Sequence, residues 1–203
     1  MTTKPPSPAP QMLQLRIVLL NIKPKIWRRV VVSSAMTFRQ LHDVIQVAMG
    51  WEDCHLHEFE VGRERIGTSS KEDSFFGGEP ALPESKLRLG EALADHKKFR
   101  YWYDFGDDWW HEITIEKRLP ANDGDPPAKL LDGENACPPE DCGGPWGYAE
   151  LCVVLADPAN PEHEEMLDWM GGDFDPKAFD KEKCARQVSR CVRVAAKPKK
   201  KAV

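Results

Sequence analysis

The order of apolar and polar positions predicts a chain that begins with β-strands. Residues 12–22 and 26–32 alternate between the two kinds and are rich in β-branched side chains, which is typical of two strands joined as a hairpin. Residues 37–49 instead carry apolar side chains at helical spacing, and Thr37 with Gln40 fits a capping box. An opening hairpin followed by a helix is therefore expected.

The next segment predicts a third strand and then a long connection. Residues 55–61 alternate, which places His55 and His57 on one face of the strand. The residues that follow are rich in serine, glycine and proline and predict a loop, after which residues 87–93 predict a short helix. We therefore expect little regular structure between the third strand and this helix.

An aromatic hairpin is predicted next. Residues 99–105 and 108–119 have strand character, and Gly106-Asp107 suits a two-residue type II′ turn between them. Residues 120–147 show no periodicity and predict a long Pro/Gly-rich loop. Helical periodicity then returns in three segments, 148–156, 161–170 and 176–192. The whole pattern predicts an α+β fold, with a mixed, mainly antiparallel sheet followed by C-terminal helices.

Length and composition predict one folded unit with distinct ends. The chain has 203 residues, of which 41% are apolar, and this is enough for an ordinary core. We expect a single α+β domain over residues 11–192, with a disordered segment at 1–10 and a basic, disordered tail at 193–203. The formal net charge is −5, but residues 1–30 carry +6, residues 180–203 carry +7 and the stretch between them carries −18. Nucleic acid is therefore a candidate partner of the basic ends only.

Membrane association is not expected. No stretch approaches the roughly 18 consecutive apolar residues that span a bilayer, and the N-terminus lacks the apolar segment of a signal peptide. We expect a cytoplasmic protein without a membrane partner. In that compartment the six cysteines are expected to be reduced thiols or metal ligands rather than disulfides.

The aromatic hairpin holds the densest group of candidate functional side chains. A turn at Gly106-Asp107 would make Asp104 and His111 diagonal neighbours, on a face that also carries Trp102 and Trp109. A carboxylate that orients a histidine between aromatic walls is a candidate general base, or the outer shell of a metal ligand. The alternative is a structural Asp–His pair beneath a packed sheet.

A metal site is the second candidate. His55 and His57 lie two residues apart on one strand face and could chelate one ion. Cys137 and Cys142 have a spacing within the range of zinc sites. Together with His111 they could form a site for zinc or another divalent metal if the loop folds over the sheet. The alternative is that the histidines belong to the core and that the cysteine loop is structural.

Familiar active-site motifs are absent from the sequence. It has no glycine-rich phosphate loop, dinucleotide fingerprint, Gly-x-Ser-x-Gly elbow or His-Glu-x-x-His helix. These absences argue against the four common classes of enzyme that depend on these motifs, and they leave other reaction classes open.

Five longer motifs resemble those of one family. They are Ile26-Trp-Arg-Arg-Val30, Leu41-His-x-x-Ile-Gln-x-Ala-Met-Gly-Trp51, His55-Leu-His-x-Phe59, Tyr103-Asp-Phe-Gly-Asp-x-Trp-x-His111 and Cys137-Pro-Pro-Glu-Asp-Cys-Gly-Gly-Pro-x-Gly-Tyr148. Through them the chain resembles the plasmid pRiA4b ORF-3-like family over about residues 11–180. The resemblance implies a plasmid- or transposon-associated protein of bacteria or archaea whose activity is uncharacterised.

Some members of that family carry a resolvase-like label, but this chain offers no obvious nucleophile set of a serine or tyrosine recombinase. The segment between Gly67 and Leu89 and the basic end after Asp180 depart from the family pattern. The polar positions that the resemblance carries over are Arg28, Arg29, His42, Gln46, His55, His57, Asp104, Asp107, His111, Glu140 and Asp141.

Three functional hypotheses follow. The first is a non-enzymatic binding or adaptor module, associated with mobile elements, that takes a protein, peptide or small-molecule ligand in a groove between the aromatic hairpin and the Pro/Gly-rich loop. The groove residues would be Arg28, Arg29, His55, His57, Trp102, Asp104, Asp107, Trp109, His111, Glu140, Asp141 and Trp146.

The second hypothesis is a metal-assisted hydrolase or nuclease. Its metal would be held by residues from His55, His57, Asp104 and His111, with Cys137, Cys142 or Glu140 as further ligands. The third is nucleic-acid binding through the basic ends.

Overall fold

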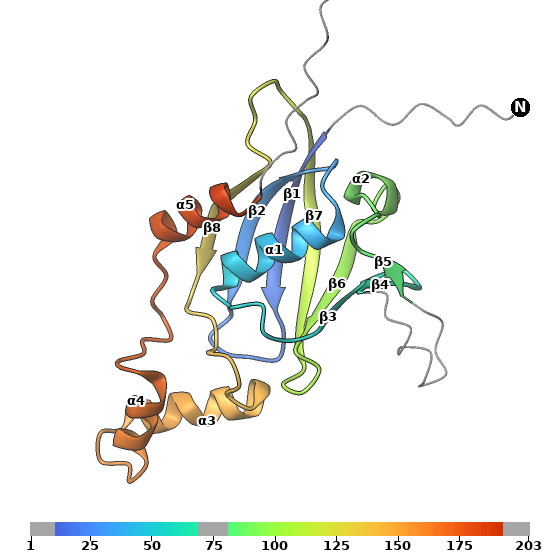
Figure 1. The fold of residues 1–203 in the computed structure, drawn as a ribbon. Helices are drawn as coiled ribbons and strands as arrows, with labels where there is room; N and C mark the ends of the chain where they lie inside the picture. Colours follow the sequence, from blue (N-terminus) through green and yellow to red (C-terminus); the bar gives the residue numbers. More distant parts are fainter. Residues whose placement is uncertain (1–10, 69–80, 193–203) are drawn as a thin grey trace, which may run out of the picture.

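An eight-stranded sheet forms the body of the protein, and the computed structural model describes residues 11–68 and 81–192. The strands are β1 (Gln11–Leu19), β2 (Trp27–Ser33), β3 (His57–Val61), β4 (Glu64–Gly67), β5 (Leu82–Pro83), β6 (Lys98–Tyr103), β7 (Trp109–Pro120) and β8 (Ala128–Glu134). They lie in the order β5-β4-β3-β6-β7-β1-β2-β8, and neighbours run antiparallel apart from β4 and β5 (Figure 1). The predicted α+β fold is thus confirmed. The segments predicted to be disordered, 1–10 and 193–203, lie outside the described residues.

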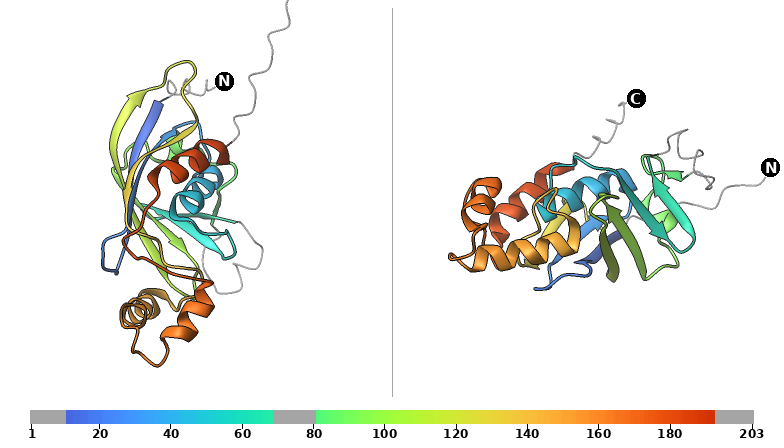
Figure 2. Two further views of the ribbon diagram at one scale, coloured as in Figure 1. Left: turned by 90° about the vertical axis from the view of Figure 1, so that its left-hand side faces the viewer. Right: turned by 90° about the horizontal axis from the view of Figure 1, so that it is seen from below.

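The helices fall into two groups. They are α1 (Phe38–Met49), α2 (Leu89–Ala92), α3 (Gly144–Ala156), α4 (His163–Met170) and α5 (Lys181–Cys191). Helices α1 and α5 lie side by side over one face of the sheet, whereas α3 and α4 form a pair beyond one end of it (Figures 1 and 2). None of the described helices is long and apolar enough to cross a membrane.

Helix α1 begins and ends where the sequence predicts. The Thr37 hydroxyl accepts a hydrogen bond from the Gln40 backbone N–H at 3.3 Å, and the Gln40 side chain accepts one from the Thr37 N–H at 3.0 Å. These two bonds satisfy N–H groups that the first helical turn leaves without partners. Gly50 ends the helix with a φ of 97°, which a residue without a Cβ adopts at little cost.

The face of the sheet beneath α1 is apolar and aromatic. Leu13, Leu15 and Ile17 point to it from β1, and Tyr101 and Tyr103 point to it from β6, all fully buried. This side is the core of the protein, which places several rings next to the polar residues of α1. On the opposite face Trp102 and Trp110 stack with their ring centroids 4.9 Å apart.

Three strands lie where the sequence predicted loops. Strands β4 and β5 fall within the predicted connection after the third strand, part of which (69–80) lies outside the described residues. Strand β8 falls within the predicted loop over 120–147, so that prediction is wrong for Ala128–Glu134. This strand pairs with β2 at the edge of the sheet, and the register shifts between Arg29 and Val30. Such a shift breaks the alternation of apolar and polar positions by which a strand is recognised.

The predicted register of the aromatic hairpin is also wrong. Tyr101 lies opposite His111 and Tyr103 opposite Trp109, so residues 104–108 form the connection in place of a two-residue turn. The shift by one residue turns His111 and Trp109 to the core face and leaves Trp102 on the opposite face. The predicted neighbour relation between Asp104 and His111 is thereby lost.

Candidate metal centre

Three segments that are distant in sequence meet at the tip of the aromatic hairpin. His55 lies two residues before the start of β3, and Asp104 directly follows β6, the neighbour of β3 in the sheet. Glu140 and Asp141 belong to the loop after β8. This loop starts from a fixed point, because the buried Arg28 guanidinium donates to the carbonyl oxygens of residues 134 and 135, each at 2.9 Å.

A histidine nitrogen lies at the centre of three carboxylates. His55 Nε2 is 3.3 Å from Asp141 Oδ1, 3.6 Å from Asp104 Oδ2 and 3.9 Å from Glu140 Oε2. Within the described part of the chain, His55 Nε2 and Glu140 Oε2 are buried atoms that have no hydrogen-bond partner. Buried polar atoms are ordinarily hydrogen-bonded, so two of them facing each other at this distance form an exceptional arrangement.

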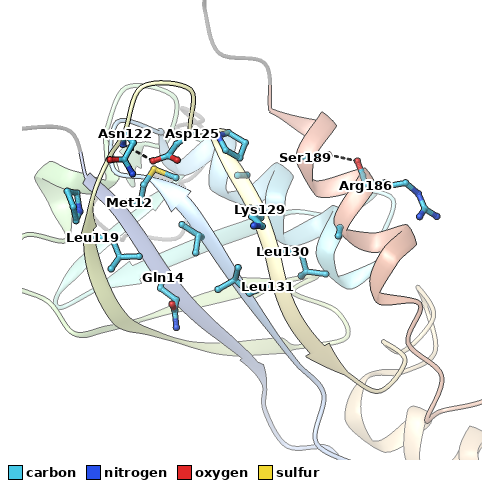
Figure 3. A pocket seen from close by; sticks show the side chains of 15 residues that line it. Met12, Gln14, Leu119, Asn122, Asp125, Lys129, Leu130, Leu131, Arg186 and Ser189 are labelled. Carbon is cyan, nitrogen blue, oxygen red and sulfur yellow. Dashed lines mark hydrogen bonds between the residues drawn. The ribbon is translucent and has the colours of Figure 1, made fainter.

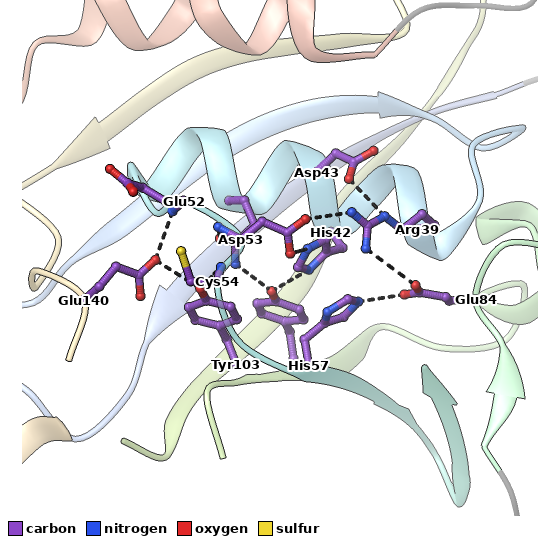
Figure 4. Close-up of polar contacts among 12 residues, drawn as sticks. Arg39, His42, Asp43, Glu52, Asp53, Cys54, His57, Glu84, Tyr103 and Glu140 are labelled. Atoms are coloured by element: carbon purple, nitrogen blue, oxygen red, sulfur yellow. Dashed lines mark hydrogen bonds and ion pairs between the residues drawn. The ribbon is translucent and has the colours of Figure 1, made fainter. Parts of the chain in front are cut away.

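Two of the three carboxylates are held by one oxygen each. Asp104 Oδ1 accepts hydrogen bonds from the backbone N–H groups of Gly106 and Asp107 at 3.0 and 3.3 Å. Glu140 Oε1 accepts from the Tyr103 hydroxyl at 3.0 Å and from the Glu52 N–H at 2.9 Å (Figure 4). The second oxygen of each of these carboxylates is thereby turned toward His55.

The Tyr103 phenol is suited to this anchoring role. Burial, and then the neighbouring Glu140 carboxylate, raises the pKa of Tyr103 well above its ordinary value. The phenol therefore keeps its proton and donates a hydrogen bond to Glu140 across the neutral pH range.

The backbone at this centre is strained at two positions. Asp104 has a φ of 51° and Asp141 a φ of 56°, in the left-handed region that residues with a side chain seldom adopt. Strain of this kind tends to gather at functional sites, where the surrounding structure holds it in place. Here it turns two carboxylates toward one point.

The loop after β8 is pressed onto the hairpin tip. The Gly143 N–H donates to Asp107 Oδ2 at 3.1 Å. The next residue, Gly144, has a φ of 68° and lies so close to the Asp107 carbonyl that a Cβ would collide with it. Glycine at 144 therefore lets the loop approach the tip and brings Asp141 to the centre.

The distances from His55 Nε2 equal or somewhat exceed those between the ligands of a divalent cation. Metal–ligand bonds of about 2.1 Å place neighbouring ligand atoms roughly 3.0 Å apart at right angles and roughly 3.4 Å apart at tetrahedral angles. The ligand atoms of His55, Asp104 and Asp141 all lie within 4.8 Å of one another, and Glu140 Oε2 lies in the same group by its distance to His55. The 3.3 Å distance already has the length expected at a metal ion, and the distances of 3.6 and 3.9 Å would have to shorten around one ion.

A second group of potential ligands lies under α1 and is built differently. His42 Nδ1 is 2.7 Å from the Tyr101 hydroxyl, and His42 Nε2 is 2.7 Å from Asp53 Oδ1. The ring of His57 stacks on that of His42 at 3.5 Å, and its Nε2 is 2.7 Å from Glu84 Oε2 (Figure 4). Unlike the atoms at His55, these ligand atoms already have hydrogen-bond partners.

Charge also argues against a cation in this second group. Arg39 lies 2.7 Å from Asp53 and 3.9 Å from Glu84, so a guanidinium already balances the carboxylates. Burial, and then the neighbouring His57, lowers the pKa of His42 to about 4, so its imidazole is neutral at pH 7 and both ring nitrogens are taken up by Tyr101 and Asp53. The group is a satisfied polar network that joins α1 to β3 and β6.

Comparison with known proteins assigns the chain to a family. The family model of the plasmid pRiA4b ORF-3-like protein matches residues 11–183. This chain belongs to the pRiA4b ORF-3-like family. An uncharacterised protein of Sinorhizobium fredii, y4hQ, is similar to it, with 41% identity over 169 residues that cover 82% of this chain and 84% of the relative.

A solved structure has the same fold as this pRiA4b ORF-3-like protein. The crystal structure of a protein of unknown function from Methanosarcina mazei Go1 aligns with a TM-score of 0.76 and 38% identity, covering 86% of this chain and 97% of the other. Both relatives are described as uncharacterised or of unknown function. The predicted family is confirmed.

The structure separates the residues that the sequence grouped as one site. His55, Asp104, Glu140 and Asp141 come together at the metal centre. His57 instead belongs to the network under α1 and is turned away from His55. The expected chelation of one ion by both histidines is therefore not the arrangement in this pRiA4b ORF-3-like protein.

His111 and Trp109 lie in the core. Burial lowers the pKa of His111 to about 3, and its Nδ1 is 3.3 Å from the Tyr101 carbonyl oxygen. Both residues are completely buried and belong to the packed aromatic layer of the core. Trp102 lies on the opposite face of the sheet, and Trp146 is 88% exposed on α3.

The two arginines of the predicted groove have structural partners. Arg28 is buried and donates to four backbone carbonyls, those of residues 27, 48, 134 and 135. Arg29 forms a two-bond ion pair with Glu116 at 2.7 and 2.8 Å. Both guanidinium groups are thus engaged within the fold.

The predicted cysteine ligands lie outside both groups of potential metal ligands found among the described residues. Burial raises the pKa of Cys142 to about 12 and raises that of Cys137 further, so both thiols stay protonated at neutral pH. The six cysteines are free thiols in the structure.

A hollow of about 840 Å³ lies across β1, β2, β8 and α5, away from the metal centre (Figure 3). Its lining includes Met12, Leu119 and Leu131 and none of the residues predicted for a groove. A smaller hollow of about 350 Å³ between α3 and α4 reaches the centre at Asp141.

Sequence reasoning missed the residues that hold the two groups in place. Tyr103 anchors Glu140, and Asp53 and Glu84 complete the network under α1. Tyr103 could have been found, because it alternates with Tyr101 on one strand face. Glu84 could not, because nothing in the sequence places it beside His57.

Proposed function

We propose that this protein is a metal-dependent hydrolase whose divalent cation is held by His55, Asp104, Glu140 and Asp141. The observation that carries the proposal is the pair of buried, unpartnered atoms, His55 Nε2 and Glu140 Oε2, which face the same point as two further carboxylates. A cation at that point would satisfy both atoms and offset the repulsion among the carboxylates.

The ligand types indicate the class of metal. Three carboxylates favour a hard cation, and the imidazole favours a transition metal, so Mn²⁺ and Zn²⁺ fit better than Mg²⁺ or Cu⁺. The sequence hypothesis of a metal-assisted hydrolase is therefore kept with a different ligand set. Neither cysteine belongs to it.

One side of the centre is open to solvent. Asp141 has a side chain that is 72% exposed, and that of His55 is 25% exposed. Catalytic metal sites keep such an open position, at which the metal activates a water molecule for attack on a substrate. The residues of the chain orient the ligands: the turn at Asp104 and the phenol of Tyr103 fix two carboxylates before any substrate arrives.

The charge of the centre argues against a nuclease. A divalent cation among three carboxylates leaves a net negative site, and no Lys or Arg is within ion-pair distance of Asp104, Glu140 or Asp141 in the described part of the chain. Phosphodiesters need compensating positive charge, so an ester or amide substrate fits better.

The test starts from the full chain purified without an affinity tag or chelator. Its metal content is measured, and Mn²⁺ and Zn²⁺ are titrated by calorimetry into the chelator-treated protein. We expect one site per chain, and an affinity at least about 10-fold lower in Asp104→Asn. The matched control is Asp53→Asn, which makes the same change in the network under α1 and should leave the affinity unchanged.

Turnover is then measured on aryl esters, peptide amides and an aryl phosphodiester. Metal-dependent hydrolysis of an ester or amide that Asp104→Asn abolishes supports the proposal. Stoichiometric metal without turnover would overturn the hydrolase and leave a metal-binding protein, whereas equal metal affinity in Asp104→Asn and the parent chain would overturn the site itself.

A further inference from the structure

The pair of helices α3 and α4 lies apart from the core and is strongly acidic. Residues 140–175 contain ten acidic residues and no Lys or Arg. The acids are Glu140, Asp141, Glu150, Asp157, Glu162, Glu164, Glu165, Asp168, Asp173 and Asp175. All but Glu140 are exposed. In the described part of the chain no Lys or Arg forms an ion pair with any of them.

These helices also leave apolar surface uncovered. Helix α4 has no buried residue, and its Trp169 is 49% exposed. Beside it on α3, Trp146 and Val153 are exposed as well. Large exposed apolar side chains on one pair of helices are typical of a surface that meets another molecule.

A hollow between the two helices combines both properties. It has a volume of about 350 Å³, and Leu151 and Val154 of α3 line it together with Met166 and Trp169 of α4. Exposed carboxylates of Glu150 and Glu162 belong to the same lining. The hollow thus offers apolar contact and negative charge at the same place.

We propose that the hollow between α3 and α4 is a docking site for a basic, amphipathic segment of a partner protein. Lys and Arg have apolar stems and cationic heads, so such a side chain can lie on Trp169 and Met166 while its charge meets Glu150 or Glu162. The aromatic ring of Trp169 adds a favourable surface for the cation itself. Nucleic acid and anionic membranes are repelled by the same carboxylates.

This site is independent of the proposed metal chemistry. Only Asp141 is shared between the hollow and the metal centre. Variants at Glu150, Glu162 and Trp169 therefore test the docking site and leave the metal ligands in place. A protein could bind metal and lack the docking site, or the reverse.

The experiment measures binding of a fluorescein-labelled 18-residue peptide of Lys and Leu, in helical amphipathic order, to the full chain by anisotropy. Two control peptides have Ser in place of Leu, or Glu in place of Lys. Measurements at 150 mM salt limit charge effects to about 8 Å. We expect micromolar binding of the Lys/Leu peptide, at least about fivefold weaker binding of the Lys/Ser peptide and none of the Glu/Leu peptide.

Matched variants locate the binding. Glu150→Gln with Glu162→Gln should weaken it by about three- to tenfold, and Trp169→Ala by about tenfold. The controls are Glu164→Gln with Glu165→Gln, which removes the same charge from the exposed start of α4, and Trp146→Ala, which removes a more exposed tryptophan outside the hollow. Both controls should change the affinity less than twofold.

Several results would overturn the proposal. If the Lys/Ser peptide bound as tightly as the Lys/Leu peptide, or if the control variants lost as much affinity as the hollow variants, the binding would come from the acidic surface as a whole and not from a docking site. Binding of single-stranded DNA or of phosphatidylserine vesicles that the hollow variants weaken would identify another partner class. Self-association that disappears when residues 193–203 are removed would make the chain's own basic end the occupant.

Discussion

Replacing Asp104 by Asn should change the stability of the protein in opposite directions with and without metal. Asn keeps the oxygen that accepts from the Gly106 and Asp107 N–H groups, so the turn is retained, but it removes one charge from the centre. The Asp104 and Asp141 carboxylate oxygens lie within 4.8 Å of each other. At this distance two unit charges repel by about 1 kcal/mol in water and about 3.5 kcal/mol at an effective dielectric constant of 20.

The lower value applies here because Asp141 is 72% exposed. In the presence of EDTA, Asp104→Asn should therefore be more stable than the parent chain by about 1 kcal/mol, or roughly 2–4 °C in Tm for a chain of this length. A metal at a hundred times its Kd stabilises the folded state by about 2.7 kcal/mol, but only if the site is intact. With Mn²⁺ or Zn²⁺ the parent chain should then become the more stable of the two.

The assay records the thermal unfolding of both proteins by calorimetry at pH 8, first with EDTA and then with increasing concentrations of metal. Asp53→Asn serves as the control, because it replaces one of the two oxygens that accept from His42 and Arg39 and should lower Tm equally with and without metal. A lower stability of Asp104→Asn in EDTA, or the same metal-induced rise in Tm for both proteins, would refute the reasoning.

Three further predictions concern the rest of the fold. Because the pKa of His42 is about 4 in the folded state, its imidazole takes up a proton in the unfolded chain first as the pH falls. The contribution of His42 to the free energy of unfolding should be complete above about pH 6.5 and fall by up to about 3 kcal/mol toward pH 4. NMR of the imidazole should show a neutral ring at pH 5. The hydrogen bond from Arg29 lowers the pKa of Glu116 to about 2, so Glu116→Gln should be less stable than the parent chain above about pH 4.5 and equal to it near pH 2, measured by urea unfolding. Arg28→Met leaves four carbonyls without their donor and should cost about 3–5 kcal/mol in the same assay, whereas a cost below 1 kcal/mol would contradict the structural role of this residue.

The sequence predicted the elements whose signals are local. The helix over 37–49 carries its own start and stop signals, and the structure has it at Phe38–Met49. The strands of the opening hairpin and of the aromatic hairpin follow from alternation alone. Strand β8 could not be found this way, because its register shift against β2 removes the alternation.

The arrangement of the metal centre could not be predicted from local patterns in the sequence. All four proposed ligands were named from the sequence, as groove residues or as metal ligands, but together with residues that the structure places elsewhere. The reason is a single connection: residues 104–108 are closed by the side chain of Asp104, which replaces a two-residue turn and shifts the register by one. That shift sends His111 into the core and turns Asp104 toward His55.

The close contact between Gly144 and the Asp107 carbonyl has a mechanical consequence. Because there is no room for even one carbon atom between them, the hairpin tip and the first residue of α3 cannot come closer together. A movement of the tip toward α3 would require the start of that helix to move as well. The close approach of α3 to the hairpin tip therefore depends on a residue that has no side chain.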